Sequence, residues 1–145
     1  GIALAGKIRQ QSYRVVVVTG DGEINEGSVW EAAMSAAKHR LSNLTVFVDY
    51  NKLQSYGPTQ EVLDLEPLPD KWRSFGFAVE EIDGHNVLAL EKLMQRLPLN
   101  KDKPTAIICH TIKGKGFPFA EGRAEWHHKS RLKEEEIVAM YECLR

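Results

Sequence analysis

The sequence has few cysteines and no long hydrophobic run. Its two cysteines, Cys109 and Cys143, can form neither a disulfide framework nor a cysteine-based metal site. No apolar stretch approaches the roughly 20 residues that a membrane-spanning helix needs. The opening residues also lack the basic lead and the cleavage site of a signal peptide. We therefore expect no membrane partner and a cytoplasmic location.

An excess of charge of one sign is also missing. The 19 Lys and Arg residues nearly balance the 20 Asp and Glu residues, which gives a formal net charge of −1. Domains that bind nucleic acid usually carry a clear basic excess, so nucleic acid is not an expected partner. The chain has 145 residues, of which 43% are hydrophobic and 27% charged, as is ordinary for one globular domain with a sizeable core.

Apolar, β-branched runs alternate with amphipathic stretches along the chain, which is typical of βαβ units around a parallel sheet flanked by helices. The pattern predicts strands over 14–19, 44–49, 77–82 and 105–110, and helices over 28–38, 70–75, 87–97 and 133–144. Because 14–19 is nearly all valine, we expect that strand to be buried on both faces. Asp70 and Asn86 are the predicted N-caps, and Gly57-Pro58 is a predicted turn.

The tripeptide Gly20-Asp21-Gly22 follows the first predicted strand, and Asn51 follows the second. Carboxylate and amide oxygens suit a hard cation such as Mg²⁺, which takes its other ligands from phosphate and water. The glycines would let the backbone approach a phosphate and adopt torsions closed to other residues. Such a tripeptide can also be only a turn. With Asn51, however, it indicates a divalent metal and diphosphate site.

Three motifs lie just past the carboxyl ends of predicted strands, at 20–22, 51–53 and 111–116. Ligands of open α/β sheets bind at that edge. In the third motif, Lys113 is flanked by flexible glycine backbone and would place positive charge beside a phosphate oxygen. Lys115 is more typical of a solvated lysine. We therefore expect one ligand site at this edge of the sheet.

Two blocks of the sequence resemble a known family. The stretch 20–33, continued at 47–54, resembles the thiamine diphosphate motif of transketolases. Residues 111–116 and then 124–129, with Trp126 and His127, resemble the later part of the same domain, in the same order. Within the family the chain looks closest to the short, split-gene N-terminal subunits, although Tyr50 stands where a second asparagine is common. The resemblance implies the diphosphate-binding domain fold over 1–145, incomplete because the upstream half of the domain is absent from this chain.

The resemblance also implies a set of metal ligands. Asp21, Asn51 and the backbone carbonyl of Leu53 would hold Mg²⁺ or Ca²⁺, so the Leu53 side chain is expected to be dispensable. The N–H group of Gly22 and the ammonium of Lys113 would bind the diphosphate of the cofactor.

Two further residues receive roles from the resemblance. His127 matches the histidine of an active-site Trp-His pair near the diphosphate and the substrate, and it is the expected catalytic residue, although a histidine in such a segment is more often a surface residue. Glu26 matches a cofactor-domain glutamate that joins a carboxylate network across the subunit interface. A plain helix-start acid is the alternative for Glu26.

The resemblance implies a transferase that uses thiamine diphosphate to move a two-carbon ketol unit between sugar phosphates. Its partner would be a pyrimidine-domain subunit, matching the C-terminal part of transketolase, in a homodimer or heterotetramer. A 1-deoxyxylulose 5-phosphate synthase, a 2-oxoacid dehydrogenase α subunit or an acyloin synthase would share the metal site. Residues 125–128 favour transketolase among these. A non-catalytic binding or assembly module is the alternative of a different class.

Overall fold

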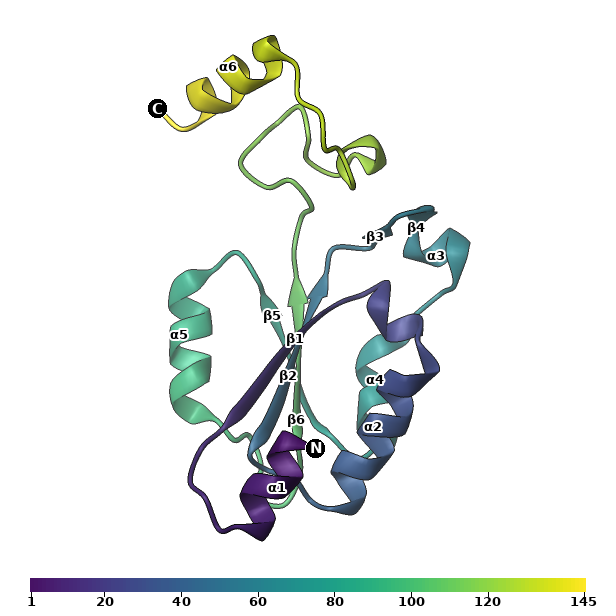
Figure 1. Ribbon diagram of the computed structural model, residues 1–145, viewed down its shortest axis with the longest axis vertical. Helices are drawn as coiled ribbons and strands as arrows, with labels where there is room; N and C mark the ends of the chain where they lie inside the picture. Colours follow the sequence, from purple (N-terminus) through teal and green to yellow (C-terminus); the bar gives the residue numbers. More distant parts are fainter.

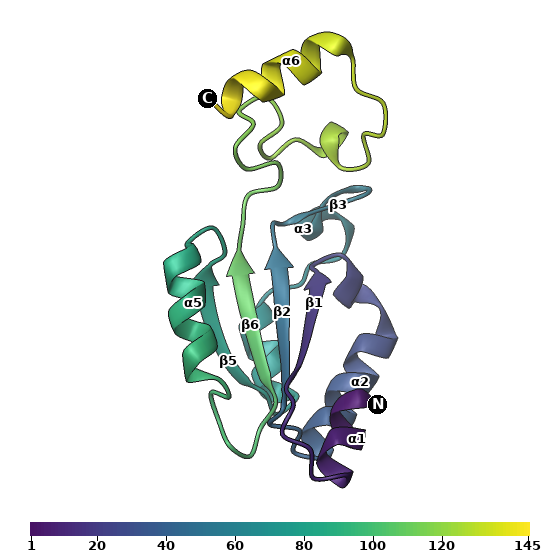
Figure 2. The same ribbon diagram turned by 60° about the vertical axis from the view of Figure 1, so that its left-hand side comes forward.

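A four-stranded parallel sheet in the order β1-β2-β6-β5 forms the centre of the computed structural model, which describes residues 1–145 (Figures 1 and 2). Its strands are β1 (Val15–Gly20), β2 (Leu44–Tyr50), β5 (Ala78–Asp83) and β6 (Thr105–His110). All three neighbouring pairs are parallel, with Val15 opposite Leu44 and Thr45 opposite Thr105. The predicted parallel α/β sheet is therefore confirmed. A short antiparallel pair, β3 (Leu53–Gln54) and β4 (Gly57–Pro58), follows β2.

Helices cover both faces of the sheet. The helices of the chain are α1 (Ile2–Ile8), α2 (Gly27–Lys38), α3 (Thr59–Val62), α4 (Leu68–Ser74), α5 (Val87–Arg96) and α6 (Glu134–Cys143), with 3₁₀ turns η1 (Glu23–Asn25) and η2 (Ala124–Trp126), and α6 lies beyond the sheet. Helices α1, α2 and α4 share one core cluster with alternate side chains of β2 and β6, and α5 packs on the opposite face through Leu93. None of the helices combines the length and apolar character needed to cross a membrane.

Part of the core and one of the two predicted helix caps follow from the sequence. Ala33 and Ala36 of α2 are buried, so the small residues do allow this helix to lie close to the sheet. Trp30 and Trp72 pack against each other with ring centroids 5.1 Å apart, as packing anchors would. The Asn86 side chain accepts a hydrogen bond from the N–H of Ala89 at 3.0 Å and caps α5 as predicted.

The expectation that the first strand is buried on both faces was wrong. Val16 and Val18 are exposed, and the exposed fraction of Val18 reaches 72%. The reason is that β1 lies at the edge of the sheet, with β2 as its single neighbour. Helix α5 packs on Phe47 and Ile107, on the face of the sheet to which Val18 belongs. It does not extend over β1, so this face of β1 is uncovered.

Two local predictions also differ from the structure. Helix α4 begins at Leu68 with Pro67 as its N-cap residue, so Asp70 lies inside the first turn and pairs with Arg73 at 2.7 Å. Proline is compatible with a first turn because the N–H that it lacks has no intrahelical partner there. Gly57-Pro58 is not the turn itself but the strand β4 that follows it.

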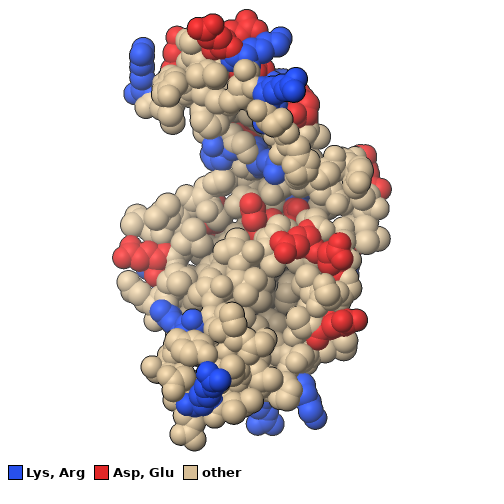
Figure 3. All heavy atoms as spheres, in the orientation of Figure 1, with Lys and Arg blue, Asp and Glu red and all other residues tan.

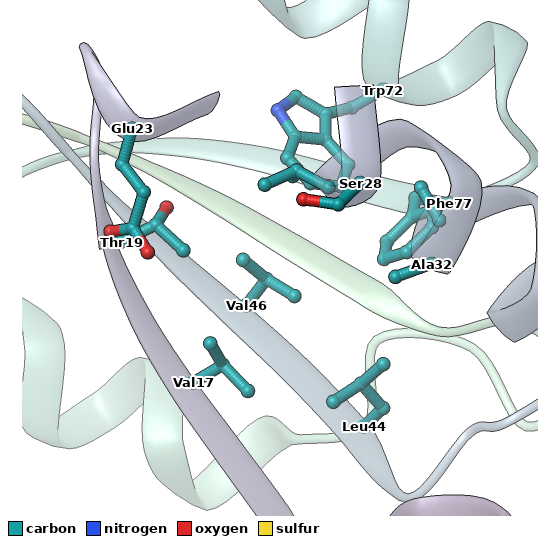
Figure 4. A pocket seen from close by; sticks show the side chains of 11 residues that line it. Val17, Thr19, Glu23, Ser28, Ala32, Leu44, Val46, Trp72 and Phe77 are labelled. Atoms are coloured by element: carbon teal, nitrogen blue, oxygen red, sulfur yellow. The ribbon is translucent and has the colours of Figure 1, made fainter. Parts of the chain in front are cut away.

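On the opposite face of the sheet, Val17 and Thr19 of β1 line an apolar cavity of about 270 Å³ beneath α2 (Figure 4). Figure 4 shows Val17, Val46 and Leu44 along its floor, with Trp72 and Phe77 opposite. Thr19 Oγ1 and Trp72 Nε1 are buried without a hydrogen-bond partner. Glu23 is the one charged residue in its lining, so this cavity does not offer the mixed charges that a metal-bound diphosphate requires.

Candidate functional site

A polar cleft of about 370 Å³ lies beyond the carboxyl ends of β1 and β2, and Leu53 is the one hydrophobic residue that lines it. The complete lining is Gly20, Asp21, Gly22, Glu23, Asp49, Asn51, Leu53, Gln54, Ser55, Lys113 and His127. The fold therefore brings every predicted site residue except Glu26 into one cleft. These residues come from sequence positions that are up to about a hundred apart, which is what an edge of a parallel sheet permits.

Glu26 lies outside this cleft. It is the exposed N-cap residue of α2 and its side chain makes no capping hydrogen bond. Glu23, in the preceding 3₁₀ turn, lines the cleft instead and accepts a hydrogen bond from the N–H of Gly20 at 3.3 Å. The position of Glu26 offers no contact with a ligand in the cleft, and its role at a subunit interface stays a prediction.

Asp21 is the buried carboxylate of the cleft, with an exposed fraction of 2%. Its Oδ1 accepts a hydrogen bond from the N–H of Gly22 at 2.7 Å, and its Oδ2 accepts one from the N–H of Lys52 at 2.5 Å. The backbone of Lys52 has a positive φ of 65°, and the turn at this residue lets its N–H donate to Asp21 Oδ2. The two bonds fix the carboxylate, and each oxygen keeps a second lone pair for a cation.

Burial raises the pKa of Asp21 above its ordinary value, and the nearby charge of Asp49 adds to this effect. The hydrogen bonds from Lys52 and Gly22 and the charge of Lys113 act in the opposite direction and lower the pKa. Burial is the largest of these causes. A buried carboxylate with a raised pKa lacks sufficient positive charge around it, which a bound cation would supply.

Asn51 and Leu53 form the second side of the cleft. Asn51 Oδ1 accepts a hydrogen bond from the N–H of Leu53 at 3.0 Å, so a tight turn brings the two residues together after β2. No group of three or more His, Cys, Asp or Glu residues gathers anywhere in the chain to hold a metal. One carboxylate with neutral oxygens is the donor set that Mg²⁺ uses when phosphate and water complete its coordination.

Gly22 is required here for space and not for its torsions. Its φ is −65°, so the expectation of a torsion closed to other residues was wrong. A Cβ atom at Gly22 would stand 2.9 Å from the Cβ of Gln54, whereas one at Gly20 would meet nothing within 4 Å. The Gly22 N–H already donates to Asp21 Oδ1. An oxygen of a bound diphosphate could therefore accept a hydrogen bond from the Gly22 N–H only as a second acceptor beside Asp21 Oδ1.

The loop that carries Lys113 is held at several points. The Thr111 hydroxyl donates to Asp49 Oδ1, and the N–H of Ile112 donates to His85 Nε2 at 2.8 Å. The Lys113 carbonyl accepts a hydrogen bond from the N–H of Gly122 at 2.9 Å. Nothing in the spacing of His85 in the sequence identifies it as the acceptor for this loop.

We expect the His85→Phe variant to loosen the Lys113 loop, because Phe has no acceptor for the N–H of Ile112. The loss of one net hydrogen bond of about 1 kcal/mol should raise the exchange rate of the Ile112 amide by roughly fivefold. Hydrogen exchange followed by NMR measures this rate. His39→Phe, at an exposed position after α2, is the control. Equal Ile112 exchange in both variants would contradict the anchoring role.

His127 enters the cleft from the segment after η2. Its Nδ1 is buried without a hydrogen-bond partner. Burial lowers the pKa of His127 below its ordinary value, and the charges of Lys113 and His128 lower it further. His128 pairs its Nε2 with Ser55 Oγ at 2.7 Å and so ties this segment to the β3–β4 hairpin.

The segment that follows β6 projects beyond the carboxyl edge of the sheet and ends in α6 (Figures 1 and 2). In Figure 3, basic atoms of this upper part and acidic atoms of the lower body face the same hollow. The lining of the cleft contains charges of both signs, on Lys113 and on Asp21, Glu23 and Asp49. Such a site can hold a cation and an anion together.

Residues 6–144 match the family model described as the transketolase, thiamine diphosphate binding domain. The chain belongs to this transketolase family. It is 45% identical over 135 residues to a 6-deoxy-6-sulfo-D-fructose transketolase subunit of a Clostridium species, and the match covers 93% of this chain and 49% of that relative. It is 42% identical over 142 residues to one of the apulose-4-phosphate transketolase subunits of Actinobacillus succinogenes, with coverage of 98% and 51%.

Solved transketolases also have this fold. A transketolase from Leishmania mexicana superposes on 99% of this chain with a TM-score of 0.85 at 26% identity, and the match covers 23% of that structure. The present chain spans about half the length of the curated relatives named above. The family and the thiamine diphosphate-binding fold predicted from the sequence are therefore confirmed.

Proposed function

We propose that this chain is the diphosphate-binding subunit of a transketolase and that residues 1–145 form the diphosphate-binding domain, or the later part of it. It would bind Mg²⁺ or Ca²⁺ and the diphosphate of thiamine diphosphate for the transfer of a two-carbon ketol unit between sugar phosphates. The observation that carries this proposal is the convergence of Asp21, Asn51, Lys113 and His127 on one polar cleft.

The residues of the cleft fit a metal-bound diphosphate. Asp21 brings a buried negative charge and Asn51 a neutral oxygen for the cation, and Leu53 brings its backbone to the same place. Lys113 brings the positive charge for the anion. The buried, unpaired Nδ1 of His127 is a group that requires a partner which the protein itself does not supply.

When bound, thiamine diphosphate supplies the electron sink for cleavage of the carbon–carbon bond of the donor sugar. The residues of this chain hold and orient it. Asp21 and Asn51 would hold the cation, and Lys113 would offset part of the negative charge of the diphosphate. His127, whose pKa is lowered by burial and by the charges of Lys113 and His128, would donate a hydrogen bond to a ligand oxygen or accept a proton from it.

A second subunit completes the proposed enzyme. The relatives named as transketolase subunits are themselves about twice as long as the matched region. Both names describe a subunit, which supports a partner that carries the pyrimidine-binding domain. Glu26, exposed at the start of α2, is available for a contact across such an interface. We propose a homodimer of fused units or a heterotetramer of split ones.

The substrates of the two relatives indicate which donors to test. One relative is named for 6-deoxy-6-sulfo-D-fructose and the other for apulose 4-phosphate. Both compounds are sugars that carry an anionic group away from the carbonyl. We propose a donor of this class, with xylulose 5-phosphate as the reference donor.

A reconstitution assay tests the proposed function. The chain is mixed with its pyrimidine-domain subunit, thiamine diphosphate and Mg²⁺, and each of the three donors is offered with ribose 5-phosphate as acceptor. We expect a product that is two carbons longer than the acceptor from at least one donor. A correctly assembled pair that binds cofactor but forms no product from any of them would favour a binding or assembly module.

A further inference from the structure

Gln54 is a half-buried residue of the cleft lining, and the nitrogen of its side-chain amide is buried without a partner. Its Nε2 atom is inaccessible to solvent and makes no hydrogen bond. Gln54 lines the same cleft as Asp21, Lys113 and His127, and no prediction from the sequence assigned it a role. A buried donor without a partner destabilises the folded protein, so its retention requires a reason.

The position of this amide is fixed by its neighbours. Gln54 ends the short strand β3, which pairs with β4 through the register Gln54 to Gly57. On its other side, Gly22 leaves room for it, because a Cβ there would meet Gln54 Cβ at 2.9 Å and Oε1 at 3.2 Å. The next residue, Ser55, bonds to His128 at 2.7 Å. The hairpin is thus tied to the elements on both sides of the cleft.

The surroundings of the amide indicate what it binds. The acidic groups of the cleft are Asp21, Glu23 and Asp49, and Gln54 donates to none of them. The other buried polar atom without a partner in this lining is His127 Nδ1, which donates in one tautomer of the ring and accepts in the other, and Lys113 adds a positive charge. The unpaired N–H group of Gln54, the ammonium of Lys113 and an imidazole that can donate in one cleft suit a ligand with several acceptor oxygens.

We propose that Gln54 is a further cofactor-binding residue, whose carboxamide donates a hydrogen bond to an oxygen of the bound diphosphate. This inference rests on the proposed function, because it takes the diphosphate as the ligand of the cleft. Gln54 would act together with Lys113 on the anion, while Asp21 and Asn51 hold the cation. Gly22 is then required on account of Gln54, since any larger residue would displace the amide.

The variant Gln54→Met tests this inference, because methionine keeps the length of the side chain and removes the donor. Titration of Mg²⁺ with inorganic pyrophosphate, and of Mg²⁺ with thiamine diphosphate, into the complex of this protein with its partner gives the two dissociation constants. A hydrogen bond to a charged acceptor is worth about 1.5–3 kcal/mol. We therefore expect both constants to rise by roughly ten- to a hundredfold. Gln60→Met, at an exposed position in α3, should leave both unchanged.

A second measurement separates ligand binding from a structural role. Without ligand, the melting temperature of Gln54→Met should equal or exceed that of the unmodified protein, because the variant removes a buried donor that has no partner. Gln54→Glu, which places negative charge at this position, should weaken pyrophosphate binding more than Gln54→Met does. A lower melting temperature with unchanged dissociation constants would overturn the inference and make Gln54 a packing residue.

The same titrations distinguish this inference from the proposed function. If the unmodified protein binds neither ligand in the presence of Mg²⁺, the proposed function fails and the role of Gln54 fails with it. If the unmodified protein binds both ligands and Asp21→Asn abolishes the binding, the proposed site stands. Unchanged binding by Gln54→Met in that case contradicts the role of Gln54 alone.

Discussion

The Asp21→Asn variant is expected to lose Mg²⁺-dependent binding of thiamine diphosphate, with a dissociation constant at least about a hundredfold higher. Asp21 is the buried carboxylate of the cleft, and asparagine keeps its shape while it removes the charge that a cation requires. Asparagine can accept one of the two backbone hydrogen bonds, from Gly22 or from Lys52, but not both. Isothermal titration with and without Mg²⁺ measures the effect.

The direction of the Asp21 pKa adds a pH dependence to this prediction. Metal binding requires the ionised carboxylate. Because burial raises the pKa of Asp21, the carboxylate takes up a proton at a higher pH than an ordinary aspartate does as the solution is acidified. Cofactor affinity should therefore fall with decreasing pH, and the fall should begin above the usual range of an aspartate.

The contribution of Asp21 to the stability of the metal-free protein should instead increase as the pH falls. A carboxyl whose folded pKa is raised holds its proton more tightly in the folded state than in the unfolded state. Its contribution to the free energy of unfolding therefore decreases as the pH rises from the ordinary aspartate pKa of 3.8 through the raised pKa. Bound Mg²⁺ should reverse this loss at neutral pH, which thermal melts with and without the ion can measure.

Asp70→Asn is the matched control for Asp21→Asn. Asp70 is an exposed carboxylate on α4 that pairs with Arg73. Its substitution should change neither the affinity nor its dependence on Mg²⁺. Metal-dependent binding that survives unchanged in Asp21→Asn would exclude this carboxylate as a ligand and with it the proposed site.

The sheet and its order along the chain were predictable because strand periodicity and helix caps are local signals. Asn86 shows this well, since its own side chain caps the helix that follows it. The burial of β1 was not predictable in the same way. A run of valines shows that a strand can be covered on both faces, but the covering elements must come from elsewhere, and none lies over Val16 and Val18.

The cleft was predictable only in its motif residues. Asp21 and Asn51 follow strands directly, so their meeting at one edge follows from parallel strand pairing. Gln54 and His85 act through contacts across more than 25 positions of the chain, to Gly22 and to Ile112. No periodicity links such positions. The amide of Gln54 is also recognisable only as a buried group without a partner, a property that no sequence pattern reveals.

His127→Ala is expected to lower the turnover of the reconstituted transferase by about a hundredfold or more, as the loss of a positioned acid–base or hydrogen-bonding group does. The imidazole lies in the cleft with Nδ1 unpaired, beside the ammonium of Lys113, which contributes to its lowered pKa. Steady-state kinetics at saturating cofactor measures turnover. His110→Ala is the control, because His110 is exposed and pairs with Glu81.

The titration of His127 gives a second test that does not depend on turnover. In the free protein its pKa lies below the ordinary value of 6.5, because burial and the charges of Lys113 and His128 disfavour the imidazolium. A bound diphosphate would bring negative charge into the same cleft and offset Lys113, so the pKa of His127 should rise when Mg²⁺ and thiamine diphosphate bind. NMR of the ring proton follows this change. If the pKa stays the same on binding while His127→Ala turns over at the normal rate, His127 faces neither diphosphate nor substrate.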